Sequence, residues 1–341
     1  MKKWIAAMLV LAMCLMLFAG CGQTPSEDTA ATQGSQGETT AAPESQVATT
    51  EDRGEHMLNG KRVIFVGNSY TYYGRAVMEK ARGVLEQKDR INDQGFFYQL
   101  CKANGAEVEV TNWTFGGHDF NDLFEVCAAN RDCDGVDHKA YLTDRAYDYV
   151  FLQIGSGSAN FDIQAFLDQC ESVMAFFREA NPDVRFCFFV QHAVHRSDYQ
   201  WRPALKELEE KGVTIVDWGA LVWDLIQKKT EVPGGTQQYI QNTFIVSQSE
   251  KDGYHPNMLT GYLTALFAYC AITGESAVGQ TYAFCNDSSI HGKFNFDKYK
   301  FQYYTYDIYT NFIDVFESEA DMNGLQQLVD QYLAEKGYRS Y

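Results

Sequence analysis

Residues 63–71 read Val-Ile-Phe-Val-Gly-Asn-Ser-Tyr-Thr. The four apolar residues at the start, three of them β-branched, predict a short strand buried on both faces, as in a parallel sheet with helices on either side. Gly67 permits a tight turn and a close approach by neighbouring chain. Ser69 therefore stands where the strand ends, with its hydroxyl beyond the carboxyl edge of the predicted sheet.

Downstream of this stretch, short apolar segments alternate with segments of helical periodicity. We expect strands at 61–66, 106–112, 147–152, 184–190 and 213–216, and helices at 75–86, 96–103, 163–180, 201–211, 218–228 and 258–273. This alternation predicts an α/β fold, a three-layer α/β/α sandwich with a mostly parallel sheet, over residues 58–280. Residues 281–341 are rich in Tyr and Phe and are expected to form a mostly helical extension packed on that domain.

Polar or glycine residues follow four consecutive predicted strands. They are Asn68-Ser69, Gly116-Gly117, the segment from Gln153 to Ser158, and the segment from Gln191 to His195. In parallel α/β sheets, ligands bind beyond the carboxyl ends of the strands. The sequence therefore predicts a functional crevice at this edge.

A second informative segment, Asp252-Gly253-Tyr254-His255-Pro256, lies far downstream. In a tight turn, Asp252 can accept a hydrogen bond from one ring nitrogen of His255 and leave the other nitrogen as a base. Each segment alone has an ordinary explanation, because Gly-Asn-Ser is a common turn and Asp-x-x-His is commonly a helix cap beside an incidental histidine. Together they supply a nucleophile, a base and an orienting acid, the set that covalent acyl transfer requires.

Taken in this order, these segments resemble the SGNH hydrolases, also called GDSL-type esterases, over roughly residues 61–275. Residues 64–69 resemble the first block of that family, Gly116-Gly117 the second, residues 151–155 stand in the place of the third, and residues 252–256 resemble the fifth. The resemblance implies a flavodoxin-like sheet, Ser69 as nucleophile, Asp252 and His255 as acid and base, and no cofactor.

The resemblance also implies that the backbone N–H groups of Ser69 and Gly117 bind the oxyanion. The chain departs from the family in two places: Gly-Asn-Ser replaces Gly-Asp-Ser, and Gly157 stands where the third block carries an asparagine. That asparagine completes the oxyanion hole, and losing one such donor typically costs about a hundred- to a thousandfold in rate. Three residues, Gln153, Ser156 and Asn160, are candidates to replace it.

The histidines outside the triad are weaker candidates. His118, beside the glycine loop, and His192, at a strand end, are candidates to line the substrate pocket, and a solvated loop histidine is the alternative for His118. His192 and His195 form an H-x-x-H pair, but no third metal ligand is in view. The sequence therefore predicts no metal site.

The amino terminus has the features of a secretion signal. Lys2 and Lys3 precede an apolar run, and residues 17–21 read Leu-Phe-Ala-Gly-Cys. This ending resembles a bacterial lipoprotein signal, which implies removal of residues 1–20, a lipid on the Cys21 sulfur, and anchoring at the extracytoplasmic face of the cell membrane. An ordinary signal peptide with an incidental cysteine is the alternative. Residues 21–57 contain almost no large apolar residue and are expected to form a disordered tether.

The net charge gives an expectation about partners, and the cysteines give expectations about the core. The formal net charge of −17 argues against nucleic acid as a partner. Cys101, Cys187 and Cys270 lie in apolar runs and are expected to be small core residues. Cys127 and Cys133 are close enough in sequence to form a local disulfide.

These observations favour a membrane-anchored serine esterase that hydrolyses O-acyl esters, in particular O-acetyl esters, of a small molecule or a glycan. The alternative is a lipoprotein of the same fold that binds a glycan or solute and has lost the chemistry, and a third option is a surface-anchored structural protein. The distance between the Ser69 hydroxyl and the His255 ring discriminates among them, because acyl transfer needs hydrogen-bond contact.

Overall fold

The computed structural model describes residues 55–77, 95–114, 142, 146–153, 162–196, 202–236, 244, 255–286 and 318–335. Within these ranges, five strands form one sheet in the order β2-β1-β3-β4-β5, and every neighbouring pair is parallel. The strands are β1 (Arg62–Gly67), β2 (Glu109–Thr114), β3 (Tyr149–Gln153), β4 (Arg185–Phe189) and β5 (Thr214–Val216). This is the strand order of flavodoxin-like folds, and it confirms the predicted fold class.

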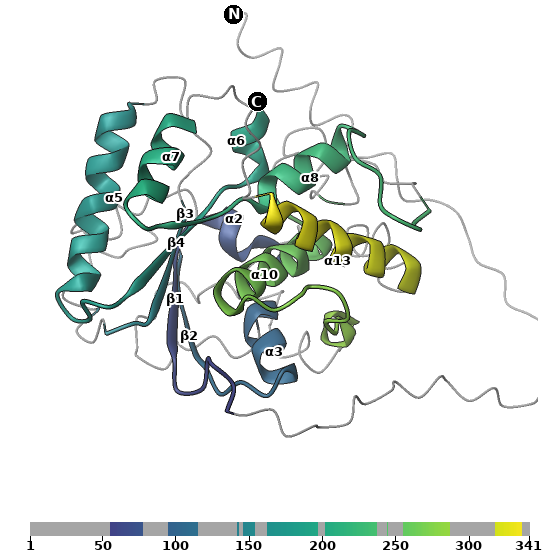
Figure 1. Cartoon of the computed structure of the whole chain (residues 1–341), viewed down its shortest axis with the longest axis horizontal. Coiled ribbons are helices and arrows are strands. Elements are labelled where there is room, and N and C mark those ends of the chain that lie inside the picture. Colours follow the sequence, from purple (N-terminus) through teal and green to yellow (C-terminus); the bar gives the residue numbers. More distant parts are fainter. Residues whose placement is uncertain are drawn as a thin grey trace, which may run out of the picture. The chain divides into compact units, whose positions relative to one another are not determined.

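Helices cover both faces of the sheet (Figure 1). The described helices are α2 (Ser69–Tyr72), η1 (Tyr73–Arg75, a 3₁₀ helix), α3 (Phe96–Ala103), α5 (Ile163–Arg178), α6 (His192–Arg196), α7 (Arg202–Glu210), α8 (Trp218–Ile226), α10 (Met258–Thr273), η4 (Ala283–Asn286, a 3₁₀ helix) and α13 (Glu319–Ala334). Buried side chains of α5 and α7 pack on one face, and those of α3, α8, α10 and α13 share a core with the other. The result is the three-layer sandwich that the alternation predicts.

The strands are apolar throughout because each sends alternate residues into two cores. Val63 and Phe65 of β1 join the core on the α10 side, whereas Ile64 and Val66 join the core on the α5 side. Side chains of a strand alternate between faces, so a strand covered on both sides has no polar face. Phe65 also stacks on Phe151 of β3 with ring centroids 4.6 Å apart, which ties the two central strands together.

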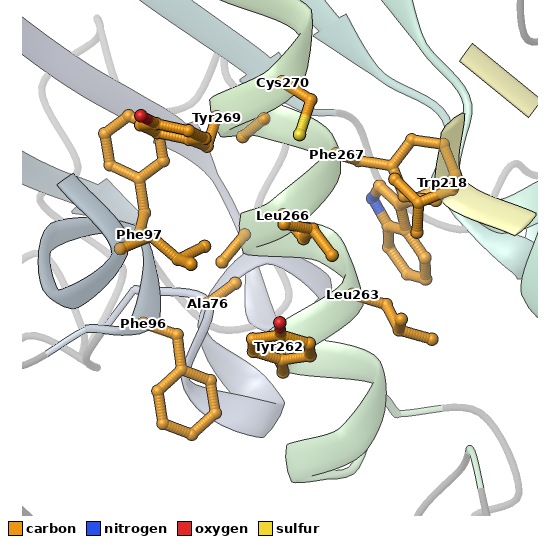
Figure 2. Packing of buried hydrophobic residues seen from close by; sticks show 14 of the residues in the cluster. Ala76, Phe96, Phe97, Trp218, Tyr262, Leu263, Leu266, Phe267, Tyr269 and Cys270 are labelled. Atoms are coloured by element: carbon orange, nitrogen blue, oxygen red, sulfur yellow. The ribbon is translucent and has the colours of Figure 1, made fainter. Parts of the chain in front are cut away.

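Helix α10 is buried along almost its whole length. Figure 2 shows Phe96 and Phe97 of α3 on one side of it and Trp218 of α8 on the other. A helix that is apolar all round belongs in the interior of a large domain. The Asn257 side chain caps its start by accepting a hydrogen bond from the Thr260 N–H at 3.0 Å. None of the described helices is both long and apolar enough to cross a bilayer.

Two glycines set the contact between α10 and the segment that follows Ser69. A Cβ placed on Gly261 would lie 1.7 Å from the carbonyl oxygen of Gly74, so only glycine allows this approach. Gly74 has a φ of 72° and Arg75 a φ of 71°, both in the left-handed region. The backbone therefore turns sharply at η1, directly against the first turns of α10.

The same turn corrects one prediction. The expected helix at 75–86 does not begin at Arg75, because the left-handed φ of that residue ends η1 instead of starting a new α-helix. Residues 78–86 lie outside the described part of the chain. Strand β2 also begins at Glu109, later than expected, because its N–H is the first in this strand to donate across the sheet, to the Lys61 carbonyl at 2.9 Å.

Helix α13 belongs to the core on the α10 side. Its Tyr332 hydroxyl donates to Asp224 of α8 at 2.8 Å, and its Gln326 side chain donates to the Tyr262 hydroxyl of α10 at 3.0 Å. These buried polar contacts fix the helix in one orientation, since an unsatisfied partner in such a place is costly. The residues on either side of α13, 287–317 and 336–341, lie outside the described part of the chain.

Among the first described residues, His56 contacts the carboxyl end of α10. The His56 Nε2 lies 3.1 Å from the Tyr269 hydroxyl, and its Nδ1 accepts a hydrogen bond from the Leu58 N–H at 3.1 Å. Tyr269 in turn donates to Glu275 at 2.7 Å. This cluster fastens the first described residues to the end of α10.

The described cysteines are core residues. Cys101, Cys187 and Cys270 are buried thiols, as predicted. Burial raises the pKa of both Cys187 and Cys270 to about 12, which keeps them protonated and unreactive. Cys127 and Cys133, the expected disulfide pair, lie outside the described residues.

Candidate active site

Ser69 and His255 meet at the carboxyl edge of the sheet. The Ser69 Oγ lies 2.9 Å from the His255 Nε2, although the two residues are 186 positions apart in sequence. At this distance the hydroxyl can donate to a neutral imidazole, which is the arrangement of a nucleophile with its general base. Because Nε2 faces the serine, Nδ1 is the nitrogen left for an orienting acid.

Regular structure on both sides holds this pair in place. Ser69 is the first residue of α2, two residues beyond the end of β1, and it is 9% exposed. His255 precedes the Asn257 cap of α10 by two residues, and α10 is pressed against η1 through the Gly74–Gly261 contact. The serine and the histidine are therefore positioned by the backbone contact between η1 and α10.

A buried polar network braces the serine turn. The Gln153 side-chain oxygen accepts from the Thr71 hydroxyl at 2.8 Å and from the Asn68 N–H at 3.3 Å. The Asn68 side chain accepts from the Tyr70 N–H at 3.1 Å. Gln153, at the end of β3, is 1% exposed, so both ends of this network are shielded from water. The asparagine of the Gly-Asn-Ser turn thus holds the backbone beside Ser69.

The three backbone N–H groups that follow Asn68 differ in whether a described residue accepts a hydrogen bond from them. The Tyr70 N–H is bound by the Asn68 side chain and the Thr71 N–H by the Asn68 carbonyl, at 2.9 Å. The Ser69 N–H donates to no group of the described residues. Of the three, it is therefore the one disposed to bind an oxyanion at the serine.

A series of ring contacts begins at His255 and continues through Tyr70 and His192 to Trp218. The Tyr70 ring stacks on the His255 ring, with centroids 5.3 Å apart and an interplanar angle of 27°. The same Tyr70 ring meets His192 edge-on at 5.9 Å, and His192 lies 5.7 Å from Trp218. His192, expected to line the pocket, is 2% exposed, and the Tyr70 ring contacts both it and His255. The contact of His192 with a substrate stays a prediction.

A second histidine, His195, pairs with the carboxylate of Asp217 near these rings. The His195 Nε2 is 2.7 Å from an oxygen of Asp217, and the same oxygen accepts from the Ala220 N–H at 2.9 Å to cap α8. Burial lowers the pKa of His195, but the charge of Asp217 and its hydrogen bond outweigh burial and raise that pKa above its usual value. The pair is a partly buried clamp between α6 and the start of α8.

Sequence analysis did not find this clamp. Asp217 directly before an apolar helical run is a recognisable N-cap. No spacing pattern, however, connects it to His195 in α6, which follows another strand. With His195 bound to Asp217 and His192 among aromatic rings, the H-x-x-H pair is divided between two environments. Among the described residues, no group of three or more His, Cys, Asp or Glu side chains could hold a metal ion.

Several predicted functional residues lie outside the described part of the chain. They are the lipidation position Cys21, the oxyanion donor Gly117, the pocket candidate His118, the replacement donors Ser156 and Asn160, and the triad acid Asp252. Of the oxyanion candidates, Ser69 and Gln153 are described, and both lie at the serine turn.

Comparison with known proteins gives distant similarities of fold. No family model matches the chain, and no curated protein is similar to it. Among solved structures, a DUF4886 family protein from Bacteroides uniformis has a TM-score of 0.46 at 13% identity, covering 82% of this chain and 97% of that one.

Two esterase structures are also similar to the chain. An acetyl-xylooligosaccharide esterase variant from Geobacillus has a TM-score of 0.41 at 16% identity, covering 64% of this chain and 94% of that one. A lipase/acylhydrolase from Enterococcus faecalis has a TM-score of 0.38 at 16% identity, covering 63% and 96%. These are likenesses of backbone at low identity.

Proposed function

We propose that this protein is a serine esterase that acts through an acyl-Ser69 intermediate. The observation that carries the proposal is the contact of 2.9 Å between the Ser69 Oγ and the His255 Nε2 at the carboxyl ends of the strands. A serine hydroxyl is a weak nucleophile until a neighbouring base accepts its proton. The described geometry supplies that base, on an edge of the sheet where parallel α/β folds bind ligands.

The reaction follows from this pair in two balanced halves. The Ser69 oxygen attacks the ester carbonyl while His255 takes the hydroxyl proton, and the protonated ring then returns that proton to the departing alcohol. A water molecule next gives its proton to His255 and attacks the acyl-serine. The ring protonates Ser69 as the acid is released. Asp252, three residues before His255 in the sequence, is proposed to accept from Nδ1 and stabilise the charged ring.

Oxyanion stabilisation is proposed to come from the Ser69 N–H together with the Gly117 N–H and one side-chain donor. Gln153 is the described candidate for that side chain, because its amide already reaches the serine turn. Its oxygen is engaged by Thr71 and Asn68, so a contribution to the oxyanion hole would come from the amide nitrogen. Ser156 is the alternative donor. A preorganised donor of this kind is commonly worth about a hundred- to a thousandfold in rate.

The substrate class and the location are proposed from the sequence. A lipid on Cys21 and the tether expected after it would place the enzyme at the extracytoplasmic face of the membrane. Esters met there include O-acetyl groups on carbohydrates, and we propose these as the substrates. One of the structures of similar fold is, by its name, an acetyl-xylooligosaccharide esterase.

Hydrolysis of p-nitrophenyl acetate by the full chain in detergent tests the reaction. The wild type should turn over, and Ser69→Ala should lose about a thousandfold or more of kcat, because the nucleophile is gone. Ser172→Ala, on the exposed side of α5, is the matched control and should behave as the wild type. Equal rates for wild type and Ser69→Ala would rule out the proposal.

A binding lipoprotein of the same fold is the second candidate. Gly157 in the place of the family asparagine favours it, because a site without that donor is a weaker catalyst. It predicts that an acetylated oligosaccharide raises the melting temperature without being hydrolysed. Release of acetate in the same samples would exclude it.

A further inference from the structure

We propose that Tyr70 is a positioning residue for the general base: its ring holds the His255 imidazole against Ser69 and stabilises the positive charge that the imidazole acquires during acyl transfer. The inference rests on the proposed function and adds a component to that site. It starts from the stacked contact of Tyr70 and His255, with ring centroids 5.3 Å apart and planes tilted by 27°.

The Tyr70 ring also packs against a second ring, that of His192. His192 presses its ring edge-on against Tyr70 at 5.9 Å, and Trp218 lies 5.7 Å beyond His192. Tyr70 is 7% exposed, and His192 and Trp218 are also buried. Closely packed rings in a protein interior have little space to turn. Among the described residues in these ring contacts, His255 is the one whose charge changes in the proposed reaction.

The Tyr70 backbone is fixed as well. Tyr70 directly follows Ser69 in α2, and its N–H is bound by the Asn68 side chain at 3.1 Å. The Gln153 side chain holds the neighbouring Thr71 hydroxyl at 2.8 Å. One short segment therefore carries both the nucleophile and the ring that stacks on its base, so the two cannot move independently.

The stacking acts on the reaction through charge. An aromatic ring within about 6 Å of a cation attracts it through the negative face of its π system. His255 is neutral when it accepts the Ser69 proton and positive in the transition state, so the attraction grows as the reaction proceeds. An interaction that is stronger in the transition state than in the ground state raises kcat and leaves KM almost unchanged. The known strength of such contacts corresponds to about two- to thirtyfold in rate.

Two substitutions separate the ring from the hydroxyl of Tyr70. Tyr70→Phe keeps the ring face and should keep kcat for p-nitrophenyl acetate within about twofold of wild type, whereas Tyr70→Leu removes the face and should lower kcat about two- to thirtyfold at unchanged KM. Tyr70→Met, whose side chain is longer and more flexible than that of leucine, repeats the test if the leucine variant is poorly folded. Equal kcat values for wild type, Tyr70→Leu and Tyr70→Met would overturn the inference.

Proton NMR tests the stacking without any turnover. Ring current from Tyr70 should shift the His255 ring protons upfield in wild type and in Tyr70→Phe, and Tyr70→Leu should move them downfield; His255→Gln assigns the resonance by its disappearance. An unchanged resonance in Tyr70→Leu would overturn the inference. If the wild type hydrolyses no ester, the proposed function fails, while this resonance still decides for or against the stacking.

Discussion

His255 and His195 each place their Nε2 against an oxygen atom, yet the two pairs differ in what surrounds that oxygen. His255 faces the neutral hydroxyl of Ser69 at 2.9 Å, beyond the carboxyl end of β1. His195 faces the carboxylate of Asp217 at 2.7 Å, and this oxygen also caps α8. A histidine and a carboxylate with no nucleophile form a structural ion pair. A histidine against a serine can activate it.

Both pairs are held by a glycine that another backbone approaches closely. At the His255 pair, a Cβ on Gly261 would lie 1.7 Å from the Gly74 oxygen. At the His195 pair, a Cβ on Gly219 would lie 2.2 Å from the Gln191 carbonyl carbon. Similar backbone packing thus supports both sites. The chemistry of each site is determined by the partner of its histidine.

Substitution of the two histidines should give the largest contrast. His255→Gln should lower kcat for p-nitrophenyl acetate by about ten-thousand- to a millionfold, because the nucleophile loses its base. His195→Gln should retain kcat within about tenfold, since the hydrogen bond of its ring goes to Asp217 and not to the serine. Both are measured by initial rates on folded protein. A comparable loss in both variants would contradict the distinction between the pairs.

The His195–Asp217 pair should matter more for the free energy of unfolding than for turnover. Asp217→Ala should lower the free energy of unfolding by about 3–5 kcal/mol, because it leaves the partly buried His195 without its partner and removes the α8 cap. Asp217→Asn keeps a capping oxygen and should cost less. Urea unfolding followed by circular dichroism gives both values. A loss below about 1 kcal/mol for Asp217→Ala would show that the clamp does not support the fold.

Alanine substitutions at the two glycines should separate effects on the geometry of the active site from effects on stability. Gly261→Ala and Gly219→Ala each force a methyl group into backbone and should each cost about 1–3 kcal/mol of stability, which urea unfolding measures. Gly261→Ala should also lower turnover of p-nitrophenyl acetate, because it pushes the start of α10 away from η1 and so His255 from Ser69. Gly219→Ala should not. Unimpaired turnover in Gly261→Ala would show that this contact does not position the site.

The pH dependence of the free energy of unfolding should show the contribution of His195. This effect should be smaller than those of the substitutions above. The pKa of His195 is lowered by burial but raised on balance by Asp217, above the value of about 6.5 in the unfolded chain. The stabilisation is therefore complete below that unfolded value and is lost as the pH rises through the folded pKa. Unfolding free energies of wild type and His195→Gln should converge with rising pH. A difference that widens with pH would contradict this assignment.

Much of the fold was predictable because local patterns determine it. The bounds of α3 and α10 agree with the predicted segments 96–103 and 258–273, since Asn104-Gly105 and Gly274 end them in ways that the sequence shows. The meeting of Ser69 with His255 was anticipated from two motifs. Arg75 was misassigned, because no propensity scale indicates that a buried arginine adopts a φ of 71°.

The contacts that sequence reasoning missed are those between distant segments without a motif. His195 with Asp217, Tyr70 with His255 and Gly74 with Gly261 each depend on how elements pack, and each residue has an ordinary local role. Gln153 was a candidate only by its position at a strand end. The structure adds that its oxygen braces the serine turn.

Labelling with a fluorophosphonate probe tests the central claim, that His255 activates Ser69, most directly. The full chain is incubated with the probe in detergent, and the modified peptide is mapped by mass spectrometry. We predict a single adduct at Ser69 in wild type and in His195→Gln, and almost none in His255→Gln. An adduct at another serine, or equal labelling in His255→Gln, would contradict the account.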